Sequence, residues 1–261
     1  MRAVGVNFNF APVADIDSNP ANPVIGDRSF GNDPQTVAAM VVDQVIGYGN
    51  GGVLSCAKHF PGHGDTDVDS HIALPTLAHS RKVIEGRELV PFKSAICYGA
   101  PAIMTAHILF PALDPSGVPA TLSKPILTEL LRNDLGFRGL IVTDCLQMKA
   151  VADTWGTARA AVMAAQAGAD LLLVCHTWEK QKETFDALVA AVRSGELSEE
   201  RVNESLARII SAKELLALAP PLPLSVVGDI EHTNLARILC EAGGVPYAGP
   251  IPAPTLGEHA F

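Results

Sequence analysis

The densest group of reactive side chains lies in one short polar segment of the chain. It reads Lys58-His59-Phe60-Pro61-Gly62-His63-Gly64-Asp65-Thr66-Asp67-Val68-Asp69-Ser70-His71. Imidazole and carboxylate groups this close together are typical of general acid–base catalysis, because histidine exchanges protons near neutral pH. A solvated loop after a strand would have the same composition, so the segment alone leaves both interpretations open.

A metal site is another interpretation of this segment. His59 and His63 are four residues apart, and three aspartates follow them. However, Pro61-Gly62 breaks the helix that would place an i,i+4 histidine pair on one face. The alternating aspartates also lack the glycine and glutamate of a calcium loop. We therefore expect no metal or other cofactor and keep a metal-dependent hydrolase only as an alternative.

Two further segments carry a charged residue in a suggestive setting. Asp144 follows the apolar run Leu140–Val142, so it should lie where a strand meets its loop. Its other interpretation is a helix N-cap, which is common for aspartate after a strand. Arg28 lies in the loop Asn22–Gly31, which is rich in proline and glycine. It is either a surface charge or a fork-shaped donor to substrate oxygens.

Short β-branched runs and longer helical patterns alternate along the chain and must position these groups. We expect strands at Val6–Val13, Val53–His59, Ala102–Ile108, Leu140–Thr143 and Leu171–Cys175. We expect helices at Pro34–Gly47, Ser80–Cys97, Lys124–Leu135, Val151–Ala167 and Glu179–Arg193. Helix ends are readable, with Asp33 before Pro34 as an N-cap and Gly168 and Gly195 as C-caps. Strands that are almost wholly apolar suit a parallel sheet covered on both faces.

Polar residues end four of these five strands. They are Asp15 and Asp17, Lys58-His59, His107, and Asp144. A barrel gathers every strand's carboxyl end around one site, whereas an open sheet uses mainly its switch point. The sequence has neither a GxGxxG nor a GxxxxGK[ST] motif. The pattern therefore predicts an α/β fold of the (β/α)8 TIM-barrel type. Because only five of the eight strands are found, we expect the barrel to be incomplete. The missing βα units would precede Met1.

The C-terminal part has a different character. A helix should run from Arg201 to about Leu218, and Pro220-Pro221-Leu222-Pro223 should end it. Asp229–Cys240 could form one more amphipathic helix, and the last 19 residues hold four prolines and four glycines. We expect residues 1–218 to be the barrel domain and residues 219–261 to be a Pro/Gly-rich linker or disordered tail.

Composition excludes several classes of function. The 261 residues carry 19 Lys+Arg against 28 Asp+Glu, a net charge of −9, with 5% aromatics, which argues against a nucleic-acid binder. No apolar run approaches the ~20 residues of a membrane span, and no signal peptide is visible, so we expect a cytoplasmic protein without membrane partners. The five cysteines have no CxxC pair and mostly lie in apolar runs, which predicts buried reduced thiols.

Three motifs in order carry a resemblance to a known family. They are Lys-His-Phe-Pro-Gly-His-Gly followed by Asp-Ser-His, preceded by Asn-Pro-Val-Ile-Gly-x-Arg-Ser-Phe-Gly and followed by Thr-Asp-x-Leu-x-Met. Together they resemble glycoside hydrolase family 3, in particular the NagZ type of β-N-acetylglucosaminidase. The resemblance extends from about Val4 to Cys175 and covers the following helices loosely.

The resemblance implies a retaining glycosidase on a (β/α)8-type barrel. Asp144 matches the catalytic nucleophile, which forms a glycosyl-enzyme intermediate. His71 matches the acid/base of this branch, with Asp69 as its partner in a dyad. Asp69 and His71 are two residues apart, so their side chains would share one side of an extended loop.

The resemblance also implies how the sugar is held. Arg28, Lys58 and His59 match residues that bind the N-acetylhexosamine, whereas we assign His63 to shaping the loop and leave the role of His107 open. The implied substrate is a small amino-sugar glycoside, from peptidoglycan fragments or from chitin. The sequence predicts no oligomeric state.

One feature of the family is not found in this chain. An Asp-x-Glu-Gly-Gly-like segment should lie upstream, and Glu231-His232 through Cys240 resembles the start of a linker helix that leads to a second domain in two-domain relatives. We therefore expect the chain to be a piece of a family 3 enzyme cut at both ends. A non-catalytic barrel remnant is one alternative. A phosphorylase is another, because His71 is neutral after protonating the leaving group and would not repel phosphate as a carboxylate would.

Overall fold

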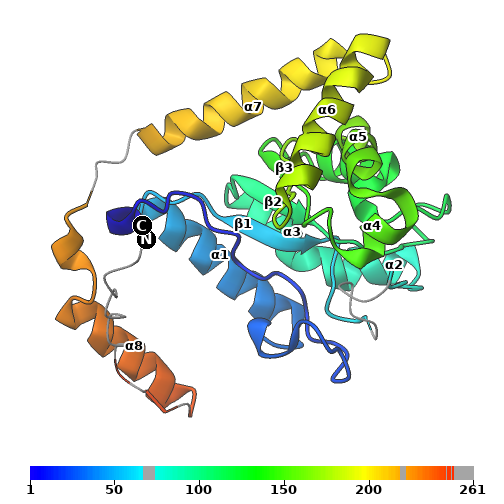
Figure 1. Cartoon of the computed structure of the whole chain (residues 1–261). Coiled ribbons are helices and arrows are strands. Elements are labelled where there is room, and N and C mark those ends of the chain that lie inside the picture. Colours follow the sequence, from blue (N-terminus) through cyan, green and yellow to red (C-terminus); the bar gives the residue numbers. More distant parts are fainter. Residues whose placement is uncertain (67–73, 218–221, 245, 248, 250–261) are drawn as a thin grey trace. The chain divides into compact units, whose positions relative to one another are not determined.

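The computed structural model describes residues 1–66, 74–217, 222–244, 246–247 and 249. Contacts divide the chain into two compact units, one of residues 7–219 and one that joins residues 1–6 to residues 220–261. Figure 1 colours both units along the sequence. The chemistry-bearing residues of the sequence all fall in the unit of residues 7–219.

A parallel sheet forms the centre of the larger unit. Its strands are β1 (Cys56–Phe60), β2 (Ala102–Thr105) and β3 (Leu140–Val142), adjacent in that order. Cys56 pairs with Ala102, which in turn pairs with Leu140. Isolated parallel bridges, Val13 to Lys58 and Val142 to Leu171, add one segment on each side of the sheet. Five parallel segments therefore follow one another in sequence order.

The two outer segments are less regular than the sequence predicts. Val6–Val13 and Leu171–Cys175 form isolated bridges rather than strands. The first segment contains Pro12, which has no N–H to donate to a ladder. In the second, the Leu173 N–H donates to the Thr143 Oγ1 (2.9 Å) instead of to a backbone carbonyl. Their order in the sheet agrees with the expectation.

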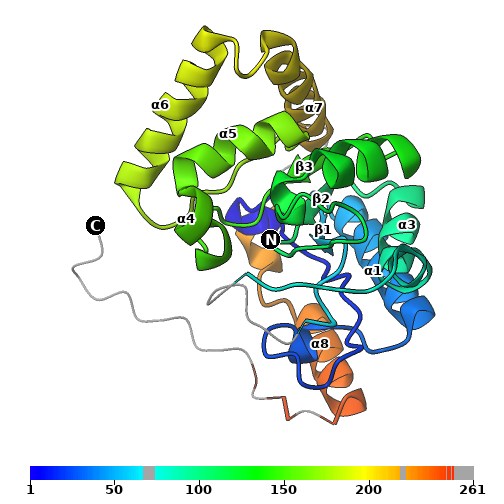
Figure 2. The ribbon, with the colours of Figure 1, turned by 90° about the vertical axis from the view of Figure 1, so that its right-hand side faces the viewer.

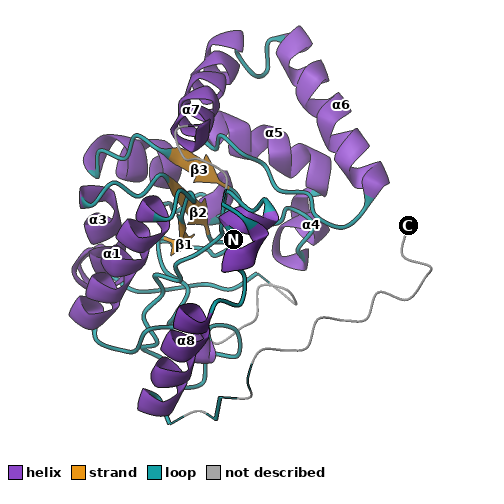
Figure 3. Ribbon diagram, turned by 90° about the vertical axis from the view of Figure 1, so that its left-hand side faces the viewer, coloured by secondary structure: helices purple, strands orange, loops and turns teal. Residues whose placement is uncertain are grey.

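Helices connect the parallel segments. The α-helices of this unit are α1 (Pro34–Asn50), α2 (Arg81–Val83), α3 (Leu89–Cys97), α4 (Lys149–Trp155), α5 (Thr157–Ala167), α6 (Trp178–Ser194) and α7 (Glu199–Ala217). Short 3₁₀ turns are η2 (Gly26–Arg28) and η4 (Ala120–Leu122), and π-helical stretches are η3 (Ile84–Glu88) and η5 (Pro125–Asp134). Figure 3 shows these helices around the three strands.

The helix ends agree with the sequence signals at several points and differ at others. The Asp33 carboxylate accepts from the Thr36 N–H (2.7 Å), as an N-cap of α1 should. The helix predicted at Val151–Ala167 is divided, because Gly156 adopts φ 72° between α4 and α5. That conformation suits glycine, which has no Cβ. After this break, α5 packs against α6 (Figure 2).

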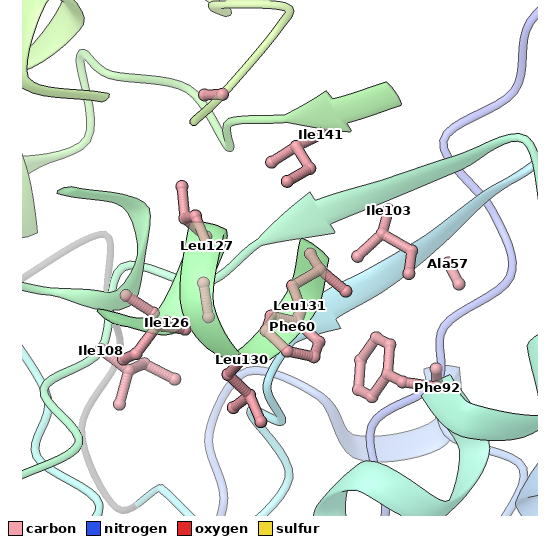
Figure 4. Packing of buried hydrophobic residues seen from close by; sticks show 14 of the residues in the cluster. Ala57, Phe60, Phe92, Ile103, Ile108, Ile126, Leu127, Leu130, Leu131 and Ile141 are labelled. Carbon is pink, nitrogen blue, oxygen red and sulfur yellow. The ribbon is translucent and has the colours of Figure 1, made fainter. Parts of the chain in front are cut away.

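Both faces of the sheet are apolar. Ala57, Ile103 and Ile141 lie on the face that packs on Phe92 and the Leu127–Leu131 stretch of η5 (Figure 4). Alternate residues, such as Cys56, Ala102 and Val142, belong to a second cluster that includes Ala212 of α7. Because side chains alternate along a strand, burial on both faces requires almost wholly apolar strands.

A buried charge network ties α7 to the sheet. Asp170 accepts from the Ile141 N–H (2.9 Å), from Ser205 Oγ (2.7 Å) and from Arg201 Nη2 (3.0 Å). The carboxylate also pairs with Arg208 Nη1 (3.1 Å) and with Arg132. Burial lowers the pKa of Arg132 to about 10, although Asp170 opposes the shift. The network joins η5, β3 and α7, and nothing in the sequence pattern predicts it.

Among its described residues, the smaller unit contains three elements. They are η1 (Arg2–Val4), η6 (Leu224–Val226) and α8 (Ile230–Ala242), and η1 contacts η6. Asp229 caps α8 by accepting from the Glu231 N–H (2.9 Å). The amphipathic helix considered for Asp229–Cys240 is therefore present.

The prediction that most cysteines are buried is wrong. Cys56 and Cys145 are buried, but Cys97 and Cys175 are exposed and Cys240 is intermediate. Cys97 is the last residue of α3, and Cys175 follows the Leu171 segment, so both lie where an element reaches the surface.

Across the described ranges, we find no helix with the length and hydropathy to cross a bilayer.

Candidate active site

Three chemistry-bearing side chains lie at the carboxyl edge of the sheet. His59 belongs to the end of β1, His107 follows β2, and Asp144 follows β3. Parallel strands present their carboxyl ends at the same edge, which brings these residues together. His59 Nε2 lies 3.9 Å from Asp144 Oδ2, and both side chains are mostly buried.

Asp144 is held as an anion. The Cys145 N–H donates to Asp144 Oδ1 (2.7 Å). Burial alone would raise the pKa of Asp144, but the positive charges of His59, His107 and Lys58, together with this N–H, lower it below its ordinary value. The alternative of a helix N-cap is not supported, because α4 begins five residues later at Lys149. A carboxylate fixed in this way can act as a nucleophile at neutral pH.

Asp15 lies directly behind these residues and has no exposed surface. It accepts three hydrogen bonds, from the His59 N–H (3.0 Å), the His63 N–H (2.7 Å) and His59 Nδ1 (2.7 Å). Burial raises the pKa of Asp15, but the charge and hydrogen bonds of His59 and the charge of His63 outweigh it, and the net shift is downward. Asp15 is therefore a buried carboxylate that organises the turn after β1.

Two glycines let this turn pack closely. A Cβ at Gly62, which has φ 139°, would lie 2.8 Å from Glu88 Oε2. A Cβ at Gly64 would overlap the carbonyl oxygen of Ile16. The glycines of the Lys-His-Phe-Pro-Gly-His-Gly motif thus place the turn against the Ile16 backbone and the buried Glu88.

Hydrogen bonds hold both the ring and the backbone carbonyl of His63 in place. Its Nδ1 pairs with Thr66 Oγ1 (2.9 Å), and Asn22 Nδ2 donates to the His63 carbonyl (2.8 Å). Burial lowers the pKa of His63, although Asp15 opposes the shift. The shaping role assigned to His63 stays a prediction. Through Asn22, the turn is joined to the loop that carries Arg28.

The structure brings together some of the predicted site residues. Lys58 and His59 surround Asp144, whose pKa both lower. Arg28 ends η2 with an exposed side chain, and its Nη2 donates to the Val24 carbonyl (2.8 Å) in its own turn. Asp69 and His71, the predicted dyad, lie outside the described residues.

His107 connects β2 to the loop that carries Asp144. Its Nε2 donates to the Cys145 carbonyl (3.0 Å), and its Nδ1 pairs with Thr121 Oγ1 (2.7 Å). The ring is buried. Because Cys145 also donates its N–H to Asp144, His107 supports the backbone that fixes the carboxylate.

An ion network lies beside the same turn. Asp65 Oδ2 pairs with His79 Nε2 (2.5 Å) and with Arg87, whose Nε also donates to Glu88 Oε1 (2.6 Å). Burial raises the pKa of Glu88, and the positive charge of Arg87 opposes this shift.

Among the residues that the structure describes, no group of three or more His, Cys, Asp or Glu is placed to hold a metal ion.

Comparison with known proteins gives a consistent result. Residues 1–212 match the family described as Glycosyl hydrolase family 3 N terminal domain. Beta-hexosaminidase A of Pseudoalteromonas piscicida is 39% identical over 93% of this chain. A family 3 β-N-acetylglucosaminidase from Paenibacillus sp. str. FPU-7 is 47% identical over 92% of this chain, with a TM-score of 0.87. The beta-glucoside phosphorylase BglX is 31% identical over 92%, with a TM-score of 0.86.

The coverage of these relatives is partial. The chain spans 44% of the Pseudoalteromonas protein and 47% of the Paenibacillus chain. It spans 46% of the phosphorylase chain. The chain thus corresponds to about half the length of each of these relatives.

Proposed function

Because this chain belongs to glycoside hydrolase family 3, we propose that it carries the catalytic centre of a retaining β-N-acetylglucosaminidase. The observation that supports this most is Asp144, a carboxylate fixed at the carboxyl end of β3, kept ionised by its surroundings and 3.9 Å from His59. The names of the Pseudoalteromonas and Paenibacillus relatives indicate the class of substrate.

The proposed reaction has two steps. Asp144 attacks the anomeric carbon while His71 gives a proton to the leaving oxygen, and a glycosyl-enzyme ester forms. Water then attacks the same carbon, His71 takes its proton, and the ester bond to Asp144 breaks with retention of configuration. Asp69 orients the His71 ring and stabilises its charged form.

The sugar is held by donors around Asp144. In this proposal, Lys58 and His59 contact the hydroxyl and N-acetyl oxygens of a terminal N-acetylglucosamine, and Arg28, carried by the neighbouring loop, turns from the Val24 carbonyl to bind the same sugar. His59 and Lys58 also favour the negative charge of Asp144 before it reacts. The substrate class is a small β-linked amino-sugar glycoside.

The proposed scaffold is part of a (β/α)8 barrel. Five parallel segments in sequence order, joined by helices, support this assignment. The polar residues gather at the carboxyl edge, where barrels carry their active sites.

Hydrolysis by the purified chain is the direct test. We expect release of p-nitrophenol from p-nitrophenyl N-acetyl-β-glucosaminide, with the β-anomer of N-acetylglucosamine as the first product by NMR. Full activity in EDTA would argue against the metal-dependent alternative. No turnover of this substrate by the folded chain would favour the non-catalytic alternative.

Phosphorolysis is a second candidate, and the likeness to a beta-glucoside phosphorylase favours it. The cationic side chains around Asp144 would tolerate a phosphate dianion, whereas a carboxylate acid/base would repel it. Product analysis in phosphate and in a non-anionic buffer at equal pH separates the two reactions. N-acetylglucosamine 1-phosphate would indicate a phosphorylase, and free sugar alone would indicate a hydrolase.

A further inference from the structure

The carboxylate of Asp15 makes its hydrogen bonds to the turn after β1. Its Oδ1 accepts from the N–H groups of His59 and His63, and its Oδ2 accepts from His59 Nδ1. The carboxylate therefore holds both the backbone and the ring of His59. In the sequence it was visible only as one of several polar residues at a strand end.

We propose that Asp15 is a positioning residue for the nucleophile. It fixes the His59 ring so that Nδ1 carries a proton toward Asp15 and Nε2 faces Asp144 and the sugar. It also serves as the counter-ion for a positive charge on that ring. This inference rests on the proposed function, in which Asp144 attacks the sugar.

The hydrogen bond between His59 and Asp15 allows only one orientation of the His59 ring. An ionised carboxylate only accepts hydrogen bonds, so at 2.7 Å from Asp15 Oδ2 the Nδ1 atom must be the donor. The opposite nitrogen then points at Asp144 Oδ2 across 3.9 Å. This distance is too long for a hydrogen bond, so the ring acts on Asp144 electrostatically.

The surrounding charges make Asp15 the counter-ion of His59. The His63 ring lies edge-on to the His59 ring, with 5.6 Å between their centroids, and burial lowers the pKa of His63. His107 and Lys58 also lower the pKa of Asp144. The charge of Asp15 also acts on Glu88, but burial raises the pKa of Glu88 and favours the neutral form of that side chain.

The variant Asp15→Asn tests the proposal. Asparagine keeps the shape and an oxygen for the two backbone N–H groups, but an amide NH₂ cannot accept from His59 Nδ1. We expect kcat/KM to fall on the order of 100-fold or more, as loss of an orienting carboxylate implies. The acid limb of the kcat/KM profile should move up by about one pH unit, because Asp144 loses a neighbouring positive charge.

Asp114→Asn is the matched control. Asp114 is also buried and accepts from the Ser116 N–H (2.9 Å) and Ser123 Oγ (2.5 Å), away from His59 and Asp144. We expect it to lose stability but to keep the position of the acid limb. A folded Asp15→Asn variant with an unmoved acid limb would overturn the proposal.

Nitrogen NMR of the His59 ring gives a readout that needs no activity. In the neutral ring of the wild-type chain we expect the proton on Nδ1, whereas in Asp15→Asn the neutral tautomer should shift toward Nε2. If the variant does not fold, the wild-type spectrum decides, since an unprotonated Nδ1 would overturn the inference. A wild-type chain inactive on N-acetylglucosaminides would contradict the proposed function instead and leave this NMR test intact.

Discussion

His59 Nε2 lies 3.9 Å from Asp144 Oδ2, so residues 85 positions apart in the chain form one electrostatic unit. The pairing arises because β1 and β3 end at the same edge of a parallel sheet, with β2 between them. It keeps a largely buried carboxylate ionised, which is the state that a nucleophile needs.

Replacement of Asp144 tests its role as nucleophile. We expect Asp144→Ala to lose roughly 1,000-fold or more of kcat/KM, because no other group can form the ester. The variant should stay folded, with a change of no more than about 1–2 kcal/mol in the free energy of unfolding, since a quarter of the Asp144 side chain is exposed. A variant that keeps a tenth of the activity would place the nucleophile elsewhere.

Leaving-group dependence tests His71. His71→Ala should spare aryl glycosides whose leaving group needs no proton and should strongly slow alkyl glycosides and disaccharides. The measurement is kcat/KM for a series of leaving groups of increasing pKa. An equal loss across the series would mean that His71 positions the sugar and does not donate a proton.

The packing of the turn after β1 makes Gly64 sensitive to substitution. Gly64→Ala should destabilise the chain by about 2 kcal/mol or more, because its Cβ would overlap the Ile16 carbonyl. Gly86→Ala is the matched control, since nothing lies within 4 Å of a Cβ there. Urea unfolding of both variants makes the comparison, and equal stabilities would contradict the close packing.

The Asp170 network should contribute strongly to stability. Asp170→Ala leaves the buried Arg132 without its carboxylate, and we expect a loss of about 3–5 kcal/mol in the free energy of unfolding. Asp186→Ala removes an exposed i,i+4 pair with Lys182 and should change it by less than about 0.5 kcal/mol. Similar losses in the free energy of unfolding for the two variants would contradict a large contribution of the Asp170 network to stability.

Acid should destabilise the fold through its paired carboxylates. The pKa values of Asp15, Asp65 and Asp144 are lowered in the folded chain. A lowered folded value means that the stabilisation is present above the unfolded value, about 3.9, and is lost as pH falls through the folded values. Glu88, whose pKa is raised, opposes this trend. Urea midpoints that stay constant from pH 6 to pH 3 would contradict the prediction.

Local signals predicted much of the scaffold because they act over a few residues. Asp33 caps α1 where expected, β2 and β3 lie inside the predicted runs, and β1 ends one residue beyond its run, at Phe60. The π-helical stretches and the break at Gly156 were not predicted, since the apolar periodicity continues through them. The amino-acid types alone could not show that Gly156 would take a positive φ.

Long-range contacts explain what the sequence could not predict about the site. The motifs named Lys58, His59 and Asp144, and the structure brings these together. Asp15 was indistinguishable from Asp17 as a strand-end carboxylate until its bonds to the turn 44 to 48 residues away were known. Asp170 likewise depends on arginines from two distant helices.

Trapping of the covalent intermediate tests the central claim most directly. The chain would be incubated with a 5-fluorinated N-acetylglucosaminyl fluoride, whose ester hydrolyses slowly, and digested for peptide mass spectrometry. The account predicts one sugar adduct, on Asp144, and none in Asp144→Ala. An adduct on another carboxylate, or turnover of the reagent without any adduct at Asp144, would contradict it.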